Sequence, residues 1–128
     1  MIMSRFKKVI LCAANKFNVY KDGKFLRELV ICDAGHFLNN MQDMMDLLED
    51  SGHVLEPVKD SSYGQGFLDD VGNYYNREDA YKIAMESGQP LNQSYALSGD
   101  ELDSSCLRHL PSNVTWEQLL DRDYKGER

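Results

Sequence analysis

The residues best suited to chemistry lie on two short strands and the helix that follows them. Phe67 and Tyr75 are aromatic residues in strand-like segments, and Arg77 and Lys82 follow in a helical one. Flat rings can stack on a nucleotide base, and a guanidinium or an ammonium can pair with phosphate. Alternation along a strand points Tyr74 and Tyr75 to opposite faces, so at most one of them is core. The set predicts a site for a phosphorylated base.

Asn76 sits between the second strand and the helix and has two competing roles. It is a good N-cap, with Asp79 placed three residues later in the first helical turn. Its side-chain oxygen could instead read a base edge, but it cannot do both. A structural interpretation of the whole set stays open as well, in which Phe67 forms the core face of the sheet and Arg77 is a solvated residue.

His36 marks a second candidate site, together with Asn39 and Asn40. The sequence predicts that these residues lie in the first turn of a methionine-rich helix. Free backbone N–H groups and the helix dipole attract anions there, and a histidine can donate to phosphate without carrying full charge. The alternative is a partly exposed histidine that only begins the helix.

Signals for catalysis or metal binding are weaker. The chain has no P-loop, no dinucleotide fingerprint, no HExxH and no nucleophile elbow. Cysteine and histidine residues supply possible ligands or a nucleophile, but their spacing matches no closed zinc template and no oxyanion donor is evident. These residues are Cys106, His109, His36 and His53. We therefore expect a protein that is not an enzyme and that uses no metal and no cofactor.

The N-terminal half predicts a hairpin followed by a helix. Strands over Val9–Tyr20 and Lys24–Val30 flank Asp22-Gly23, a strong two-residue hairpin turn. Apolar residues then recur at three- and four-residue spacing over about 34–50, which indicates an amphipathic helix that Gly52 ends. Val54-Leu55 is predicted to add a short strand that stops at Pro57.

The C-terminal half predicts a second hairpin near 66–75 and a helix over 77–87 that ends at Gly88. One or two helical turns are expected within Gly99–Leu107, and a capping box predicts a short helix from Thr115 to Asp121. The fold class is thus α+β, with a small antiparallel sheet packed against two main helices. We expect one domain over 1–128, with 103–128 as a C-terminal extension and 124–128 frayed.

Composition limits the kind of partner. The net charge of −7 argues against general affinity for DNA, RNA or anionic lipid, although a local positive pocket could still hold a small anion. Three widely spaced cysteines and no secretory signal pattern predict free thiols in a cytoplasmic protein. The apolar run from Val9 to Ala14 is too short to cross a membrane.

The chain resembles the phage anti-Thoeris signal-sequestering (sponge) proteins, which hold cyclic ADP-ribose isomers made by bacterial TIR-domain defence enzymes. Some members are also described as holding cyclic oligonucleotides. The resemblance covers about residues 8–102. In one-letter code, with a dot for any residue, the family pattern reads GF, G.F..R, A..IA and GQ in chain order. The matching residues are Gly66-Phe67, Gly72, Tyr74, Arg77, Ala80, Ile83-Ala84 and Gly88-Gln89.

The resemblance implies an α+β protein that forms a dimer or a hexamer, with pockets at subunit contacts. It further implies that Phe67 stacks on a base, that Arg77 supports the pocket or pairs with phosphate, and that His36 lies near the ligand entrance. The family's acidic element falls on Ser98, Asp100, Glu101 and Leu102, where Gly99 interrupts it.

Two functions are therefore expected. The first is a phage counter-defence protein in the host cytosol that binds a cyclic nucleotide-type signal without cleaving it. The predicted ligand-binding residues are Phe67, Tyr75, Asn76, Arg77, Lys82, His36, Asn39 and Asp100. The alternative is an acidic interaction protein that inhibits a host protein by direct binding, which the charge of −7 favours.

Overall fold

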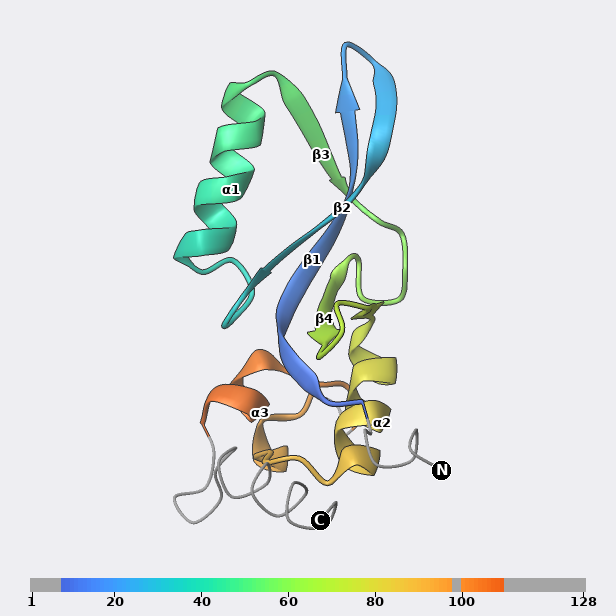
Figure 1. Cartoon of the computed structure of the whole chain (residues 1–128), viewed down its shortest axis with the longest axis vertical. Coiled ribbons are helices and arrows are strands. Elements are labelled where there is room, and N and C mark those ends of the chain that lie inside the picture. Colours follow the sequence, from blue (N-terminus) through green and yellow to red (C-terminus); the bar gives the residue numbers. More distant parts are fainter. Residues whose placement is uncertain (1–7, 98–99, 110–128) are drawn as a thin grey trace.

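A computed structural model describes residues 8–97 and 100–109 and confirms the α+β class (Figure 1). The predicted helix after Thr115 and the predicted frayed end lie outside the described residues. The elements in chain order are β1 (Ile10–Lys21), β2 (Lys24–Asp33), α1 (Asn39–Asp50), β3 (His53–Pro57), β4 (Gln65–Asp69), β5 (Tyr74–Tyr75), α2 (Arg77–Ser87), the 3-10 turn η2 (Gln93–Tyr95) and α3 (Ser104–Arg108).

Strand β1 is the spine of the sheet (Figure 1). Along one edge it pairs antiparallel with β2, and along the other edge it pairs first with β4 and then with β3. Strand β5 extends the sheet beyond β4. The β1–β2 turn is the predicted one: Asp22 and Gly23 have φ of 52° and 76°, which a type I′ hairpin requires.

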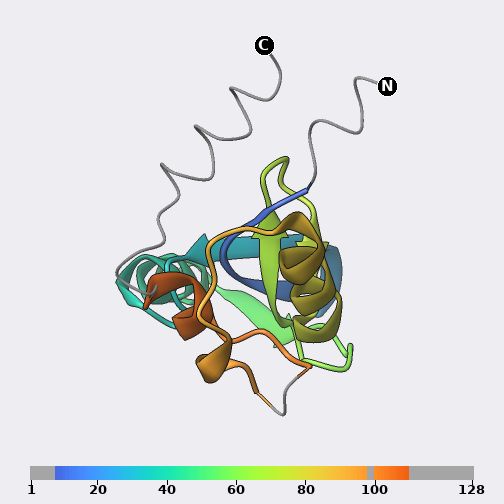
Figure 2. The same ribbon diagram turned by 90° about the horizontal axis from the view of Figure 1, so that it is seen from below.

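Two separate hydrophobic cores lie along β1. The first lies under α1 and contains Phe17, Ile31 and Met41. The second lies where α2 and α3 flank the other end of β1 (Figure 2). Its buried residues are Ile10, Ala13, Phe67, Ala80, Ala84, Leu102, Cys106 and Leu107. One strand therefore supplies residues to both cores.

Helix α1 begins later than predicted, at Asn39 instead of near residue 34. Phe37 adopts a left-handed φ of 59°, which a helix cannot include, and Leu38 is extended. The Asp33 carboxylate accepts a hydrogen bond from the Met41 N–H at 3.0 Å and so caps the first turn from outside the helix. His36 consequently lies in the loop before the helix. The prediction that it lies in the first helical turn was wrong.

Helix α2 begins and ends as predicted. The Asn76 side chain accepts a hydrogen bond from the Asp79 N–H at 2.8 Å, and Gly88 closes the helix in the left-handed region with φ of 69°. The Asn76 oxygen is therefore used as a cap.

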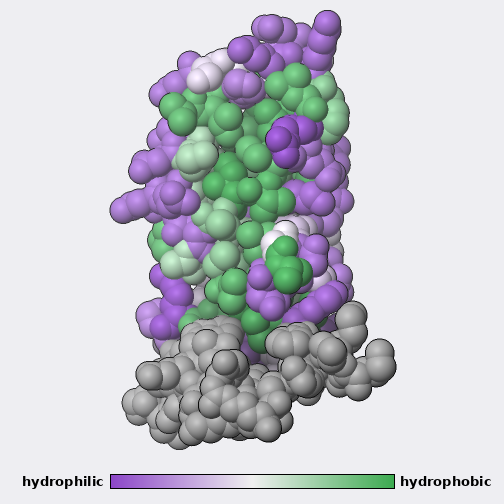
Figure 3. All heavy atoms as spheres, viewed as in Figure 1, coloured by the Kyte–Doolittle hydropathy of each residue, from purple (hydrophilic) through white to green (hydrophobic). Residues whose placement is uncertain are grey.

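One face of the molecule is markedly apolar. Figure 3 shows hydrophobic side chains gathered along the middle of the face drawn in Figure 1, with hydrophilic side chains on both sides. On β2 and α1, the large hydrophobic side chains that stay exposed include Leu26, Met44 and Leu47.

Candidate functional site

Arg77 is the first residue of α2 and is buried, with 9% of its surface exposed. Its Nη1 donates to the Leu102 carbonyl at 2.8 Å, and its Nη2 donates to Gln65 Oε1 at 3.3 Å. The nearest carboxylate oxygen, on Asp103, is 3.8 Å from Nη1. Burial lowers the pKa of Arg77, and Asp103 opposes that shift, yet an arginine stays charged. A buried cation thus holds the segment around Leu102.

His36 packs against Arg77 and is neutral at pH 7. Its Nε2 donates to the Gly66 carbonyl at 2.8 Å, which leaves Nδ1 to face Arg77 Nη2 at 3.5 Å. Burial of the ring, followed by the Arg77 charge, lowers the pKa of His36 to about 4. The histidine therefore adds no positive charge beside the guanidinium.

The Phe67 ring packs against both His36 and Arg77. Its ring is fully buried and meets the His36 ring edge-on at 5.2 Å, while the Arg77 guanidinium lies 5.9 Å from its centre. Within this chain the ring has no free face for a base, so the stacking role that the resemblance implied does not fit its position. The fold does bring the predicted residues His36, Phe67 and Arg77 together, but as a buried cluster.

Other residues of the resemblance also have structural roles. A Cβ at Gly66 would overlap the Tyr75 carbonyl oxygen, so only glycine fits where β4 passes β5. The buried Gln89 amide pairs with both backbone groups of Ile10, at 2.8 and 2.9 Å. Ala80 and Ala84 pack into the second core.

Tyr75 lies beside this cluster and Asn39 does not: Tyr75 is opposite Phe67 in the β4–β5 pairing and packs against the second core. The Tyr75 hydroxyl donates to Asp69 Oδ2 at 3.0 Å, and the Lys8 ammonium lies 5.4 Å from the centre of the ring. The neighbouring Tyr74 hydroxyl donates to Asp60, so both tyrosines are half-buried and bonded at their polar ends. Asn39 is exposed at the start of α1. The predicted site residues therefore do not form one pocket.

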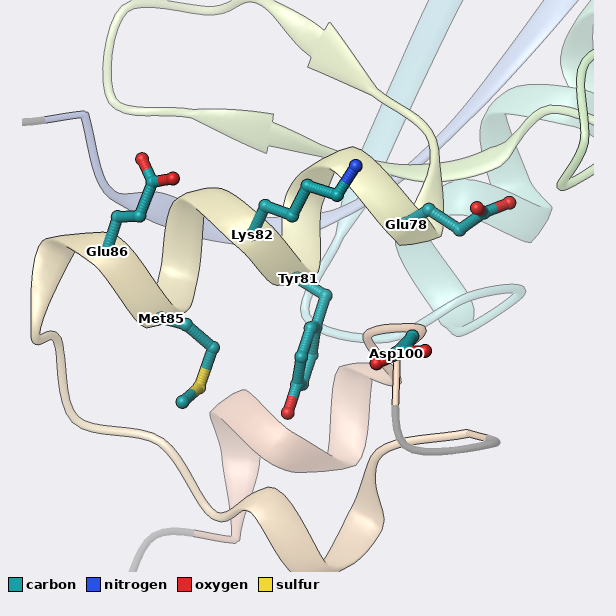
Figure 4. Close-up of a pocket in the computed structure, with 6 residues that line it drawn as sticks. All are labelled: Glu78, Tyr81, Lys82, Met85, Glu86 and Asp100. Carbon is teal, nitrogen blue, oxygen red and sulfur yellow. The ribbon is translucent and has the colours of Figure 1, made fainter.

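An open groove lies on the outer side of α2 and contains two of the predicted residues, Lys82 and Asp100. Its volume is about 520 Å³. Tyr81 and Met85 project from one side of α2, and Asp100 lies beside the tyrosine ring (Figure 4). Lys82 and Glu86 project from the opposite side of the helix. Glu78 and Glu86 complete the lining. Four of the lining residues were not predicted from the sequence, because the groove exists only where α2 lies beside a distant segment; they are Glu78, Tyr81, Met85 and Glu86.

The buried cluster and the groove are linked through Arg77. Its backbone carbonyl accepts from the Leu102 N–H at 3.1 Å, while its side chain donates to the Leu102 carbonyl. Glu101 also pairs with Leu97 through two backbone bonds. The wall that carries Asp100 is therefore fixed to the first turn of α2 by a residue that does not itself line the groove.

Cysteine and histidine residues do not gather into a reactive centre in the part of the chain that the structure describes. Cys106 is buried in the second core, and burial raises the pKa of its thiol. His109 packs against Tyr95, with the ring centres 5.3 Å apart. Among residues 8–97 and 100–109, no three His, Cys, Asp or Glu side chains are placed to hold a metal ion together.

Comparison with known proteins assigns the family. A family model described as phage T4 y16D protein matches residues 9–116. The chain belongs to the phage T4 y16D protein family. No curated protein and no solved structure matches it significantly.

The y16D family assignment supports the phage side of the resemblance and leaves sponge activity as a prediction. The match spans β1 through α3, so it includes the buried cluster and both walls of the groove. In the described part of this y16D family member, no helix has the length and apolar character needed to span a membrane.

Proposed function

We propose that this phage protein holds a small ribose-containing signal with few phosphates, of the cyclic nucleotide type, in the groove beside α2. The observation that carries the proposal is the groove itself. At about 520 Å³ it lies within the size range of small-molecule sites, roughly 300–1,000 Å³. Its lining includes an aromatic ring, one ammonium group and carboxylates.

The lining suits each part of such a ligand. The Tyr81 ring offers a flat face to a base, and the Lys82 ammonium can pair with a phosphate. Carboxylates such as Asp100 and Glu78 accept hydrogen bonds from ribose hydroxyls, as acidic residues do in dinucleotide sites. Because the lining contains three carboxylates and one ammonium, the groove favours a ligand with few phosphates over a polyanion.

Arg77 acts in this proposal as a positioning residue. It fixes Leu102, and through it the chain that carries Asp100, against the first turn of α2. Phe67 and neutral His36 support the guanidinium from within. The roles of these residues thus differ from those that the resemblance to sponge proteins implies. Phe67 and Arg77 support the wall of the proposed site and do not contact the ligand.

Binding without turnover suits this arrangement. Sequestering a signal requires affinity and a slow off-rate, whereas catalysis requires groups that bind the transition state more tightly than the substrate. The protein would act in the cytosol of the infected host, where it would lower the concentration of free signal.

The test is calorimetric titration with cyclic ADP-ribose and with a cyclic dinucleotide as probes. We expect saturable binding of one probe, with the probe recovered intact by mass spectrometry after the protein is heated. Y81A and K82Q should weaken binding at least about tenfold. K24Q, which changes an exposed lysine at the distant hairpin, is the matched control and should bind as the parent does.

Three results would contradict the proposal: no binding of either probe, a hydrolysed probe, or equal binding by K82Q and K24Q. A stoichiometric host protein recovered from a lysate without any bound nucleotide would favour the alternative, direct inhibition of a host protein.

A further inference from the structure

Strand β2 leaves one edge of the sheet open. It pairs with β1 alone among the described strands. The Lys16 N–H and carbonyl bond to Gly64 and Val58, so they face the β3–β4 side of β1. Val30 lies opposite Lys16 in the antiparallel register, and its own backbone groups therefore point away from β1. The open edge is centred on Val30.

A line of uncharged residues on α1 lies along the same edge. Asn40, Met44 and Leu47 follow one another at four- and three-residue spacing, so they share one side of the helix. Asn40 Nδ2 donates to the Cys32 carbonyl at 3.0 Å, which shows that this side faces β2. Met44 is 42% exposed and Leu47 is 61% exposed. The acidic residues of α1 lie off this line; they are Asp43, Asp46, Glu49 and Asp50.

The open edge of β2 carries one positive and one negative residue at equal distances from Val30. Arg27 and Asp33 lie three residues before and after Val30, opposite Val19 and Ala13, and so they share the face that α1 covers. If two copies pair antiparallel with Val30 opposite Val30, Arg27 of each copy faces Asp33 of the other. An unrelated strand would have to supply this pattern by chance, whereas a second copy supplies it by symmetry.

We propose that two copies of this chain join through β2 about a two-fold axis at Val30, forming one continuous sheet. The Asn40–Met44–Leu47 sides of the two α1 helices then meet over the joined strands and bury Met44 and Leu47, which are exposed in the single chain. Backbone bonds between Val30 and its copy satisfy the groups that the single chain leaves open. The groove beside α2 lies on a different element, so this dimer does not depend on ligand binding.

The first test is the mass of the full chain in solution over a range of concentrations. We expect a dimer for the parent. M44E/L47E places facing carboxylates in the contact and should raise the dimer dissociation constant at least about a hundredfold, with an unchanged circular dichroism spectrum. V54E/V71E is the matched control, because Val54 and Val71 are 54% and 73% exposed and lie away from the β2 edge. It should remain dimeric.

The second test fixes the register. In a C32S background, V30C should form a covalent dimer on mild oxidation, because directly paired residues lie about 5.5 Å apart between Cα atoms. In the proposed dimer, position 28 of one copy faces position 32 of the other. E28C in the C32S background should therefore not cross-link, because it faces a serine. E28C with Cys32 retained should cross-link. A monomeric parent, a dimeric M44E/L47E or a V30C variant that fails to cross-link overturns the proposal.

Discussion

At the scale of single residues, the cluster of His36, Phe67 and Arg77 buries one positive charge, and the Asp103 carboxylate lies 3.8 Å from it. Burying a charge costs free energy unless hydrogen bonds satisfy it, and here the Leu102 carbonyl and the Gln65 amide do so. His36 helps by staying neutral and presenting an acceptor nitrogen to the guanidinium. Protonating that histidine would place two cations side by side.

This arrangement predicts a pH dependence of stability. The pKa of His36 is about 4 in the folded chain against an ordinary 6.5, so the unfolded chain binds more protons between these values. The free energy of unfolding should therefore be constant above pH 6.5 and fall as pH drops toward 4. Urea denaturation at pH 7 and pH 5 measures the difference.

H36Q is the informative variant, because glutamine can still donate to the Gly66 carbonyl but does not titrate. We expect its unfolding free energy to change less between pH 7 and pH 5 than that of the parent. The carboxylates of Asp33 and Asp69 have a pKa below the usual 3.8, so they act at more acidic pH. An equal pH dependence in H36Q would show that another group is responsible.

At the scale of elements, helix α2 is held at its start by a local cap and at its end by a long-range bond. Asn76 caps the first turn, and Gln89, just after the helix, docks on the backbone of Ile10. The two contacts fix the direction of α2 against β1. They should differ in energetic weight, because only the second involves fully buried groups.

Removing the cap should have a modest effect. N76A should lower the free energy of unfolding by about 1 kcal/mol, whereas N76D, which keeps an acceptor at the helix N-terminus, should be close to the parent. Chemical denaturation of both variants measures this. A larger loss in N76D than in N76A would mean that the Asn76 amide has a role beyond capping.

Replacing Gln89 should have a larger effect. Q89E keeps the shape of the side chain but turns a donor to the Ile10 carbonyl into a buried carboxylate, so we expect a loss of about 3–5 kcal/mol. Q93E makes the same change at an exposed position and should stay within about 0.5 kcal/mol of the parent. Thermal melting of the pair provides the comparison.

The sequence predicted those elements whose signals are local. The Asp22-Gly23 hairpin and helix α2 carry their turn and capping residues within a few positions, and both agree with the structure. The start of α1 was predicted wrongly because its cap, Asp33, lies outside the helix and Phe37 adopts an unusual φ. No pattern of residue types announces such a backbone conformation.

The candidate site was predicted only in part, for a similar reason. The sequence grouped Phe67 with Arg77 correctly, but strand alternation alone does not say which face of β4 is covered. The groove depends on the pairing of α2 with the chain near Leu102, a contact between distant segments. Lys82 and Asp100 were therefore predicted without the Tyr81 ring that lies between the groove walls.

At the scale of the whole molecule, β1 makes one structure of two cores. Phe17 belongs to the core under α1, and Ile10 and Ala13 belong to the core beside α2, yet all three lie on one continuous strand. Neither core can lose its packing without disturbing that strand. We therefore expect the described part of the chain to unfold as a single cooperative unit.

Truncation in each core tests this cooperativity. M41A and L102A remove fully buried side chains from the two cores, and each should cost about 2–5 kcal/mol. Hydrogen exchange should then show that either variant lowers the protection of the most stable amides on both sides of β1. A loss confined to the mutated side would indicate two independent units.

The central position of β1 also affects how the protein is made. The Ile10 N–H donates to the Gln89 side chain, 79 residues further along. The first strand to leave the ribosome therefore cannot form this contact until Gln89 has been synthesised. At 5–20 residues per second this interval lasts about 4–16 s. During it, a nascent chain with an apolar strand at its front has no permanent partner for one end of that strand. Growth at lower temperature, or extra chaperone in the expression host, should therefore raise the soluble yield.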